Sequence, residues 1–194
     1  MQDRAERTRA ALLRATAELV NESRYRDATM AAIAQRAGAS KGSLYFHFAS
    51  KDALCAALRD EALRTQRRLL RRAASGPGSG GRRLLVFARA LTARLTEDPV
   101  FRAGLRLDGE SAAGDGESTA RDGGIRLQWR DFALEQLSGR AAPDRRTQAG
   151  AALLTAVLAG LEELSRNSED WLRPGVLEPL WDLLEPGLTP DRDS

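Results

Sequence analysis

Polar and cationic side chains follow one another closely in residues 40–51, Ser-Lys-Gly-Ser-Leu-Tyr-Phe-His-Phe-Ala-Ser-Lys. The charged, donor-bearing and small residues of this segment are Lys41, Gly42, Ser43, Tyr45 and His47. Cations and donors contact phosphates and base edges when a short recognition helix enters the major groove, and small residues let the backbone approach closely. The segment therefore predicts nucleic-acid binding.

Catalytic chemistry has few candidates in a chain with one histidine and one cysteine. Residues 75–81 are rich in glycine, but they lack the lysine and the preceding strand of a phosphate-binding loop. We therefore expect no enzymatic activity, no catalytic residues, no metal site and no cofactor. Cys55 cannot form an intrachain disulfide, which fits a reducing compartment. It is expected to fill core space, and a redox sensor is the alternative.

Charge is distributed unevenly along the chain, whose 30 basic and 27 acidic residues give a formal net charge of +3. Residues 1–72 hold 15 basic and 8 acidic residues, a balance of +7, whereas the remainder holds 15 and 19, a balance of −4. This asymmetry predicts a module that binds a polyanion, joined to a second part. The arginines between Arg64 and Arg72 form either a solvated helix face or an extension of the electrostatic field over DNA.

Helical patterns and caps position the polar segment. Residues 3–21 have apolar side chains at helical spacing. Thr29 is expected to cap a short helix closed by Gly38 in a left-handed conformation, and Ser40 to cap a second helix over residues 41–47. Two short helices joined by a turn that contains glycine form a helix-turn-helix.

The rest of the chain is predicted to be helical as well. Ser50 is expected to cap a long helix over residues 51–74, and residues 75–81 interrupt the chain. Further helices are predicted over residues 82–97, 99–107, 125–138, 144–165 and 174–185, with a mobile loop over residues 108–124. The predicted fold class is all-α, with an N-terminal three-helix module that contains the helix-turn-helix and a larger C-terminal helical domain.

The longest apolar stretch, residues 151–161, is much shorter than the roughly 20 residues that a membrane span needs. No secretory signal pattern opens the chain. We therefore expect a cytoplasmic protein with no membrane partner.

Residues 28–51 resemble the DNA-binding signature of the TetR family of transcriptional regulators, ending in Leu-Tyr-Phe-His-Phe-Ala-Ser-Lys. The family usually has glycine in the turn after the first helix, where this chain has Ser-Arg-Tyr at residues 23–25. The resemblance implies that double-stranded DNA is a partner and that it is contacted by Thr29, Ser40, Lys41, Gly42, Ser43, Tyr45, Phe46, His47 and Lys51. Leu44 and Phe48 would pack the module. Core packing is the alternative for Tyr45, and bridging of two helices is the alternative for His47.

Residues 98–107 and the pair Trp129-Arg130 resemble the γ-butyrolactone receptor subgroup of that family. The subgroup includes pseudo-receptors, which respond to antibiotics or their precursors instead of butyrolactones. The resemblance implies a small hydrophobic ligand beside Trp129, whose indole N–H needs a buried partner or a ligand acceptor. Ordinary core is the alternative for the other residues expected to line the pocket, which are Phe87, Leu91, Phe101, Leu105 and Phe132.

Residues 150–164 include ten Ala, Val or Leu among fifteen, so a helix there is apolar nearly all round. Such a helix must be buried on two sides. This pattern predicts a homodimer, for which the resemblance implies the four-helix interface of the family, and a monomer with a thick core is the alternative. The residues expected at the interface are Leu153, Leu154, Val157, Leu161, Leu177, Leu180, Trp181 and Leu184. A two-fold dimer reads a palindromic operator with half-sites about 34 Å or a multiple apart.

These features together predict a ligand-responsive transcriptional repressor. Residues 1–50 would form the DNA-binding domain, residues 51–74 a connecting helix, and residues 82–194 the domain for ligand binding and dimerisation. The effector would be a γ-butyrolactone or an antibiotic or its intermediate. The alternatives are a constitutive DNA-binding regulator without a small-molecule ligand, and an activator.

Overall fold

A computed structural model describes residues 2–22, 25–114, 124–139 and 141–188. Within these ranges the chain forms α-helices and one 3₁₀-helix but no strand, which confirms the all-α fold class. None of the helices described is long and apolar enough to cross a membrane. Among the same residues, no three or more His, Cys, Asp or Glu side chains gather where they could hold a metal ion.

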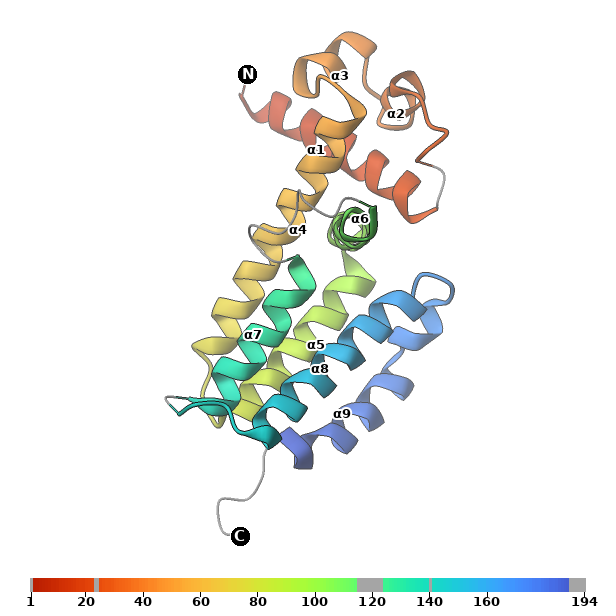
Figure 1. Ribbon diagram of the computed structural model, residues 1–194. Helices are drawn as coiled ribbons and strands as arrows, with labels where there is room; N and C mark the ends of the chain where they lie inside the picture. Colours follow the sequence, from red (N-terminus) through yellow and green to blue (C-terminus); the bar gives the residue numbers. More distant parts are fainter. Residues whose placement is uncertain (1, 23–24, 115–123, 140, 189–194) are drawn as a thin grey trace. The chain divides into compact units, whose positions relative to one another are not determined.

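The helices follow one another in the order shown by the colours of Figure 1. They are α1 (Gln2–Asn21), α2 (Met30–Arg36), α3 (Lys41–His47), α4 (Lys51–Ala74), α5 (Gly80–Glu97), α6 (Pro99–Gly114), α7 (Ile125–Ser138), α8 (Arg145–Leu164), the 3₁₀-helix η1 (Glu169–Leu172) and α9 (Pro174–Leu188).

The predicted loop over residues 108–124 is partly wrong, because α6 continues through Gly114. Its last turns lack large apolar side chains, but a helix that tertiary packing has already nucleated needs only residues that tolerate helical geometry. Residues 115–123 of the predicted loop lie outside the described residues. The sequence pattern also missed η1 and ended α9 too early, before its second internal proline, Pro186.

Two compact units divide the chain differently from the predicted segments. Unit 1 comprises residues 1–65 and 98–115, and unit 2 comprises residues 66–97 and 116–194. α6 belongs to unit 1 because it packs against α1, a contact between distant parts of the sequence that no local pattern reveals. The helix α4 contributes to unit 1 up to Thr65 and to unit 2 from Gln66.

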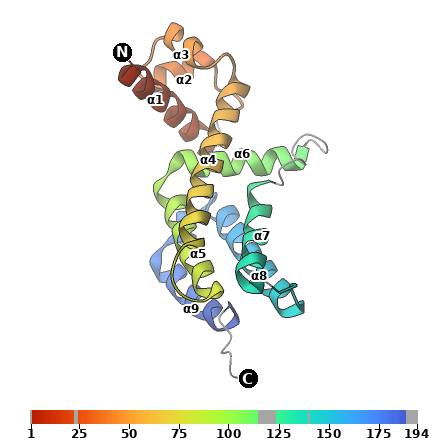
Figure 2. The ribbon, with the colours of Figure 1, turned by 90° about the vertical axis from the view of Figure 1, so that its left-hand side faces the viewer.

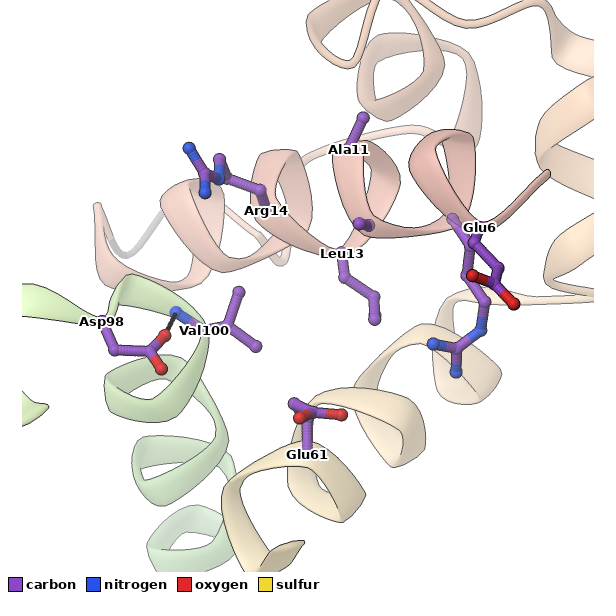
Figure 3. Close-up of a pocket in the computed structure, with 9 residues that line it drawn as sticks. Glu6, Ala11, Leu13, Arg14, Glu61, Asp98 and Val100 are labelled. Carbon is purple, nitrogen blue, oxygen red and sulfur yellow. Dashed lines mark hydrogen bonds between the residues drawn. The ribbon is translucent and has the colours of Figure 1, made fainter. Parts of the chain in front are cut away.

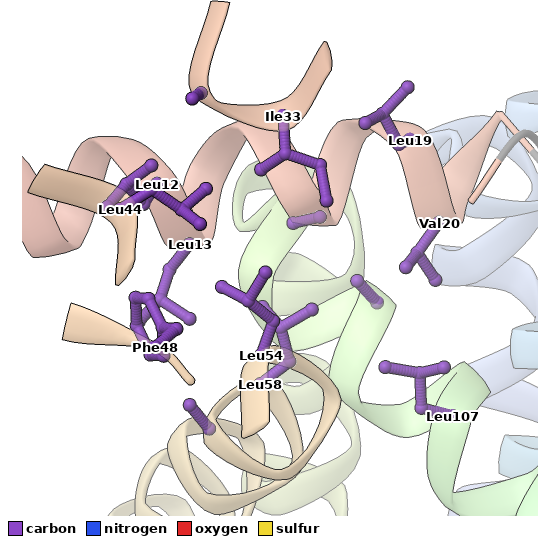
Figure 4. Close-up of a cluster of buried hydrophobic side chains, with 14 residues drawn as sticks. Leu12, Leu13, Leu19, Val20, Ile33, Leu44, Phe48, Leu54, Leu58 and Leu107 are labelled. Carbon is purple, nitrogen blue, oxygen red and sulfur yellow. The ribbon is translucent and has the colours of Figure 1, made fainter. Parts of the chain in front are cut away.

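Unit 1 is built around a core to which each of its helices contributes (Figure 4). Leu44 of α3 is fully buried and Phe48 nearly so, which confirms that these two residues pack the module. Gly104 brings α6 against α4: a Cβ there would lie 2.5 Å from the Leu58 carbonyl oxygen and 2.5 Å from the Cβ of Ala62. A larger residue would force the two helices apart.

The predicted caps of the short helices are confirmed. The Thr29 hydroxyl accepts a hydrogen bond from the Ala32 N–H at 3.1 Å, and the Ser40 hydroxyl accepts one from the Ser43 N–H at the same distance. Gly38 has φ +63°, a left-handed conformation that glycine adopts without the steric cost of a side chain. Local sequence therefore specifies both the starts of α2 and α3 and the turn between them.

Unit 2 packs its helices around α5, which contacts α7, α8, α9 and η1. α7 and α8 lie side by side in both ribbon views (Figures 1 and 2). At the start of α5, Gly80 approaches α7 so closely that a Cβ would lie 1.8 Å from the Gln136 carbonyl oxygen. The resulting core includes Phe87, Leu91, Trp129 and Trp181, each at most 1% exposed.

Candidate nucleic-acid interface

The helix α3 has one buried and one exposed face. Leu44 anchors it in the core, whereas Tyr45 is 57% exposed and Phe46 is 81% exposed. Lys41 and Gly42 at its start are exposed as well. Since most of the Tyr45 side chain lies in solvent, the alternative of a core role for it is wrong. An anchored helix with an outward cation and two outward aromatic rings is a suitable shape for contact with a polyanion.

The side chains of the other candidate residues on this surface make only some contacts within the protein. His47 is half-buried, with its ring centroid 5.1 Å from that of Phe46 and 6.4 Å from that of Phe48. Thr29 and Ser40 are exposed, and Ser43 is half-buried. A capping hydroxyl accepts from the backbone with its oxygen and keeps its own proton to donate. Capping by Thr29 and Ser40 is therefore compatible with a contact to phosphate.

Lys51 makes contacts within the protein, whereas a contact with DNA phosphate was expected. Its ammonium donates to the carbonyl oxygens of Tyr25 at 2.9 Å and Arg26 at 3.1 Å, and it lies 4.7 Å from the centroid of the Tyr25 ring. The Tyr25 hydroxyl in turn donates to the Lys51 carbonyl oxygen at 2.7 Å. Burial, followed by the hydrogen bond with Cys55, raises the pKa of Tyr25, which keeps the donor protonated. Lys51 thus links the segment that precedes α2 to the start of α4.

Replacing Lys51 by Met should therefore lower the free energy of unfolding by about 1–3 kcal/mol, because charged hydrogen bonds and a cation–π contact are lost. Denaturant titration measures this change. Wild-type stability in this variant would contradict the structural role. If, in addition, the slope of the log binding constant for DNA against log salt concentration falls by about one, the ammonium contacts phosphate instead.

Two hollows border α1 within unit 1. One, of about 650 Å³, lies between α1, the start of α6 and α4 and has side chains of both charges, with Glu6, Arg14, Glu61 and Asp98 among them (Figure 3). Asp98 accepts hydrogen bonds there from the N–H groups of Val100 and Phe101, each at 3.0 Å. The other hollow lies beside the start of α3 and is lined in part by Arg4 and Arg7. The sequence pattern did not single out these two arginines, although they contribute to the basic N-terminal charge.

The residues expected to line a ligand pocket fall in both units. Phe101 and Leu105 lie on α6 in unit 1, whereas Phe87, Leu91, Trp129 and Phe132 lie in unit 2. All six are buried. The rings of Phe87 and Phe132 are 5.3 Å apart in an edge-to-face arrangement. In unit 2 these side chains therefore pack as core, the arrangement expected under the alternative interpretation.

The indole N–H of Trp129 has a protein partner that the sequence pattern missed. It donates to the side-chain oxygen of Gln66 at 2.6 Å. The amide nitrogen of Gln66 donates to the carbonyl oxygen of Ile125 and to the side chain of Gln128, both at 3.1 Å. Gln66 is fully buried. Its only signal in the sequence is an uncharged polar residue among the apolar positions of α4.

The residues expected at a dimer interface are divided between core and surface. Five of the eight are buried inside unit 2, which is a correction: Leu154, Leu161, Leu177, Trp181 and Leu184. Leu153 is 50% exposed, and Val157 and Leu180 are half-buried. The exposed apolar face also includes Leu164, Val176 and Leu183, the last at 79% exposure. On both α8 and α9 these residues recur every three to four positions or a multiple, so each helix has an exposed apolar stripe beside its buried one, roughly a quarter turn away around the helix axis.

The sequence of the chain resembles those of known bacterial proteins. Residues 12–58 match the model of the bacterial regulatory proteins, tetR family. The A-factor receptor protein of Streptomyces griseus is 29% identical over 164 residues, which cover 84% of this chain but only 57% of that protein. The chain thus spans little more than half the length of this relative.

Solved structures resemble nearly the whole chain. CprB from Streptomyces coelicolor, a TetR family protein in complex with its biological operator sequence, is 30% identical and has a TM-score of 0.75. The similarity covers 97% of this chain and 91% of CprB. A γ-butyrolactone receptor described as an ArpA-like protein is 28% identical, with a TM-score of 0.68 over 95% of this chain and 97% of the receptor.

Proposed function

Because the chain belongs to the tetR family of bacterial regulatory proteins, we propose that it binds an operator in duplex DNA and regulates transcription. The observation that supports this proposal best is the outward face of α3. Lys41, Tyr45 and Phe46 project from a helix anchored by Leu44, inside the segment that matches the family. A homodimer would place α3 of each protomer in successive major grooves of a palindromic site. Phe46 would meet a thymine methyl group or a sugar.

The effector proposed for this regulator is a small hydrophobic molecule bound beside Trp129. Support comes from similarity to proteins described as an A-factor receptor and a γ-butyrolactone receptor. The effector would be a γ-butyrolactone, or an antibiotic or its intermediate as in pseudo-receptors. It would act as an inducer that releases a repressor. It can do so only through its differential affinity for the two states, typically about 1–3 kcal/mol of coupling.

A constitutive regulator without an effector is the second candidate, and one observation favours it. The indole N–H of Trp129, expected to seek a ligand acceptor, already donates to Gln66 within a packed core. An effector beside Trp129 would have to displace core side chains or exchange this hydrogen bond.

Selection of bound DNA from a random pool tests both candidates. A palindromic consensus is expected, and no enrichment would contradict the proposed function. Addition of γ-butyrolactones, antibiotics and antibiotic intermediates to the selected complex then separates the candidates. Release by any of them supports an effector-responsive regulator, and an operator complex that none of them dissociates supports the constitutive one.

Replacing Lys41 by Ala is expected to weaken operator binding about ten-fold or more, since a lost charged contact costs about 1–3 kcal/mol. If the ammonium contacts phosphate, the log–log salt slope falls by about one. Arg94→Ala is a matched control, because it removes one exposed cation from α5 in unit 2. A Lys41 variant that behaves like the Arg94 variant in affinity and slope would remove Lys41 from the interface.

A further inference from the structure

The hollow beside the start of α3 has a volume of about 660 Å³ and three walls within unit 1. α1 contributes one wall, the turn between α2 and α3 a second, and α3 itself the third. The lining includes Arg4, Arg7 and Thr8 of α1, Gly38 and Ser40 of the turn, and Ser43 of α3. The hollow therefore adjoins the segment that carries the proposed DNA contacts.

Among the described residues that line this hollow, the charged side chains all have the same sign. Arg4 and Arg7 are its charged residues, and none of the side chains described around it is a carboxylate. The mixed hollow of Figure 3 differs in this respect, because Glu6, Glu61 and Asp98 line it together with arginines. Two guanidinium groups present a fork of N–H donors that matches the oxygens of a phosphate.

Small residues leave the opposite wall accessible. Gly38 and Ser40 are exposed, and a Cβ at Gly38 would meet no other atom within 4 Å. The Ser40 hydroxyl accepts from the Ser43 N–H and has its own proton to donate. The Thr8 hydroxyl, in contrast, donates to the Arg4 carbonyl oxygen at 2.9 Å and so contributes shape to the wall more than a donor. The chemistry of the hollow is therefore that of an anion site with two cations and a hydroxyl.

We propose that this hollow binds a phosphodiester group of the operator backbone, with Arg4 and Arg7 as phosphate-binding residues beside α3. The inference rests on the proposed function, since it requires a DNA ligand. A phosphate held between α1 and the turn before α3 would set the register of α3 on the duplex without reading a base. Arg4 and Arg7 then affect affinity on every sequence and leave the preference among sequences unchanged.

Salt titration of operator binding tests the site. The variants are Arg4→Ala, Arg7→Ala and the double variant, with Arg14→Ala as the matched control. Arg14 lies about 10 Å beyond Arg7 along the axis of α1 and lines the mixed hollow of Figure 3. We expect the log–log salt slope to fall by about one for each of the two arginines and by about two for the double variant. Arg14→Ala should change it by less.

Charge-preserving variants and a titration with a free anion provide two further tests of the site. Arg4→Lys and Arg7→Lys should retain most of the salt slope. A titration of the protein with inorganic phosphate, followed by NMR, distinguishes a DNA phosphate from a free anion. Signals from the hollow that shift with phosphate while the double variant binds operator with an unchanged slope would assign the site to a free anion and overturn the proposal.

The same binding measurements distinguish failure of the phosphate site from failure of the proposed function. If the wild-type protein selects no DNA, the proposed function fails and the phosphate site fails with it. If the wild-type protein binds an operator but the double variant matches Arg14→Ala in slope and affinity, only the phosphate site is wrong.

Discussion

Replacing Leu183 by Glu is expected to convert the protein into monomers and to lower operator affinity by about 10²–10⁴-fold. Leu183 is 79% exposed in α9, so the carboxylate costs little in the isolated protomer. In the proposed dimer the same carboxylate would lie unpaired in an apolar interface. A monomer has one copy of α3, and it loses the gain in affinity that comes from linking two binding modules.

Analytical ultracentrifugation and operator titration measure the two effects. Leu127→Glu is the matched control, because Leu127 is 53% exposed on α7 in the same unit but outside the apolar face of α8 and α9. It should leave both mass and affinity unchanged. If Leu183→Glu stays dimeric while the wild-type protein is a dimer, the interface lies on another surface. A monomeric wild-type protein would contradict the homodimer itself.

Replacing Trp129 by Ala is expected to lower the free energy of unfolding by about 3–5 kcal/mol, as is typical when a large aromatic side chain is removed from a core. Trp129 is 1% exposed and its N–H is bonded to Gln66. Loss of effector response in this variant would therefore not separate a lost pocket from a damaged core. Trp129→Phe keeps most of the volume and should cost less, about 1–3 kcal/mol, by leaving the Gln66 oxygen without its donor.

Denaturant unfolding of a double-mutant cycle measures this contact. Trp129→Phe and Gln66→Leu should together cost about 0.5–3 kcal/mol less than the sum of the single changes, because each alone leaves a buried polar group unpaired. Additive effects would contradict a stabilising hydrogen bond. The Phe variant also suits effector studies: if it is stable, binds operator and is released as the wild-type protein is, the effector does not use the indole N–H.

Local signals in the sequence were sufficient for the helix-turn-helix. Thr29 and Ser40 cap helices through hydrogen bonds that span three residues, and Gly38 adopts its left-handed conformation for reasons contained in its own backbone. The face of α3 was equally predictable, since Leu44 and Phe48 are four residues apart on one side of it. The all-α class followed from the same short-range periodicity.

Periodicity did not decide which apolar side chains of unit 2 face inward. On a helix that is apolar nearly all round, such as α8, every face fits a buried position, so Leu153 and Leu154 were equally good interface candidates. Packing against α5 and α7 buries Leu154 and leaves Leu153 exposed. The buried carboxylate of Glu162 is a similar case, because its cationic partners include Arg126 from α7 as well as Arg166 from the turn after α8.

The sequence by itself thus determined the fold class, the helix-turn-helix with its caps and the outward polar face of α3, because those features depend on residues within about one helical turn of each other. Only the tertiary structure decided the unit to which α6 belongs, the carbonyl partners of Lys51 and the Gln66 partner of Trp129. Each of these depends on atoms that lie from 25 to 85 residues apart in the chain and meet only after the helices have packed. Their partners are chosen by that packing, which no periodic pattern encodes.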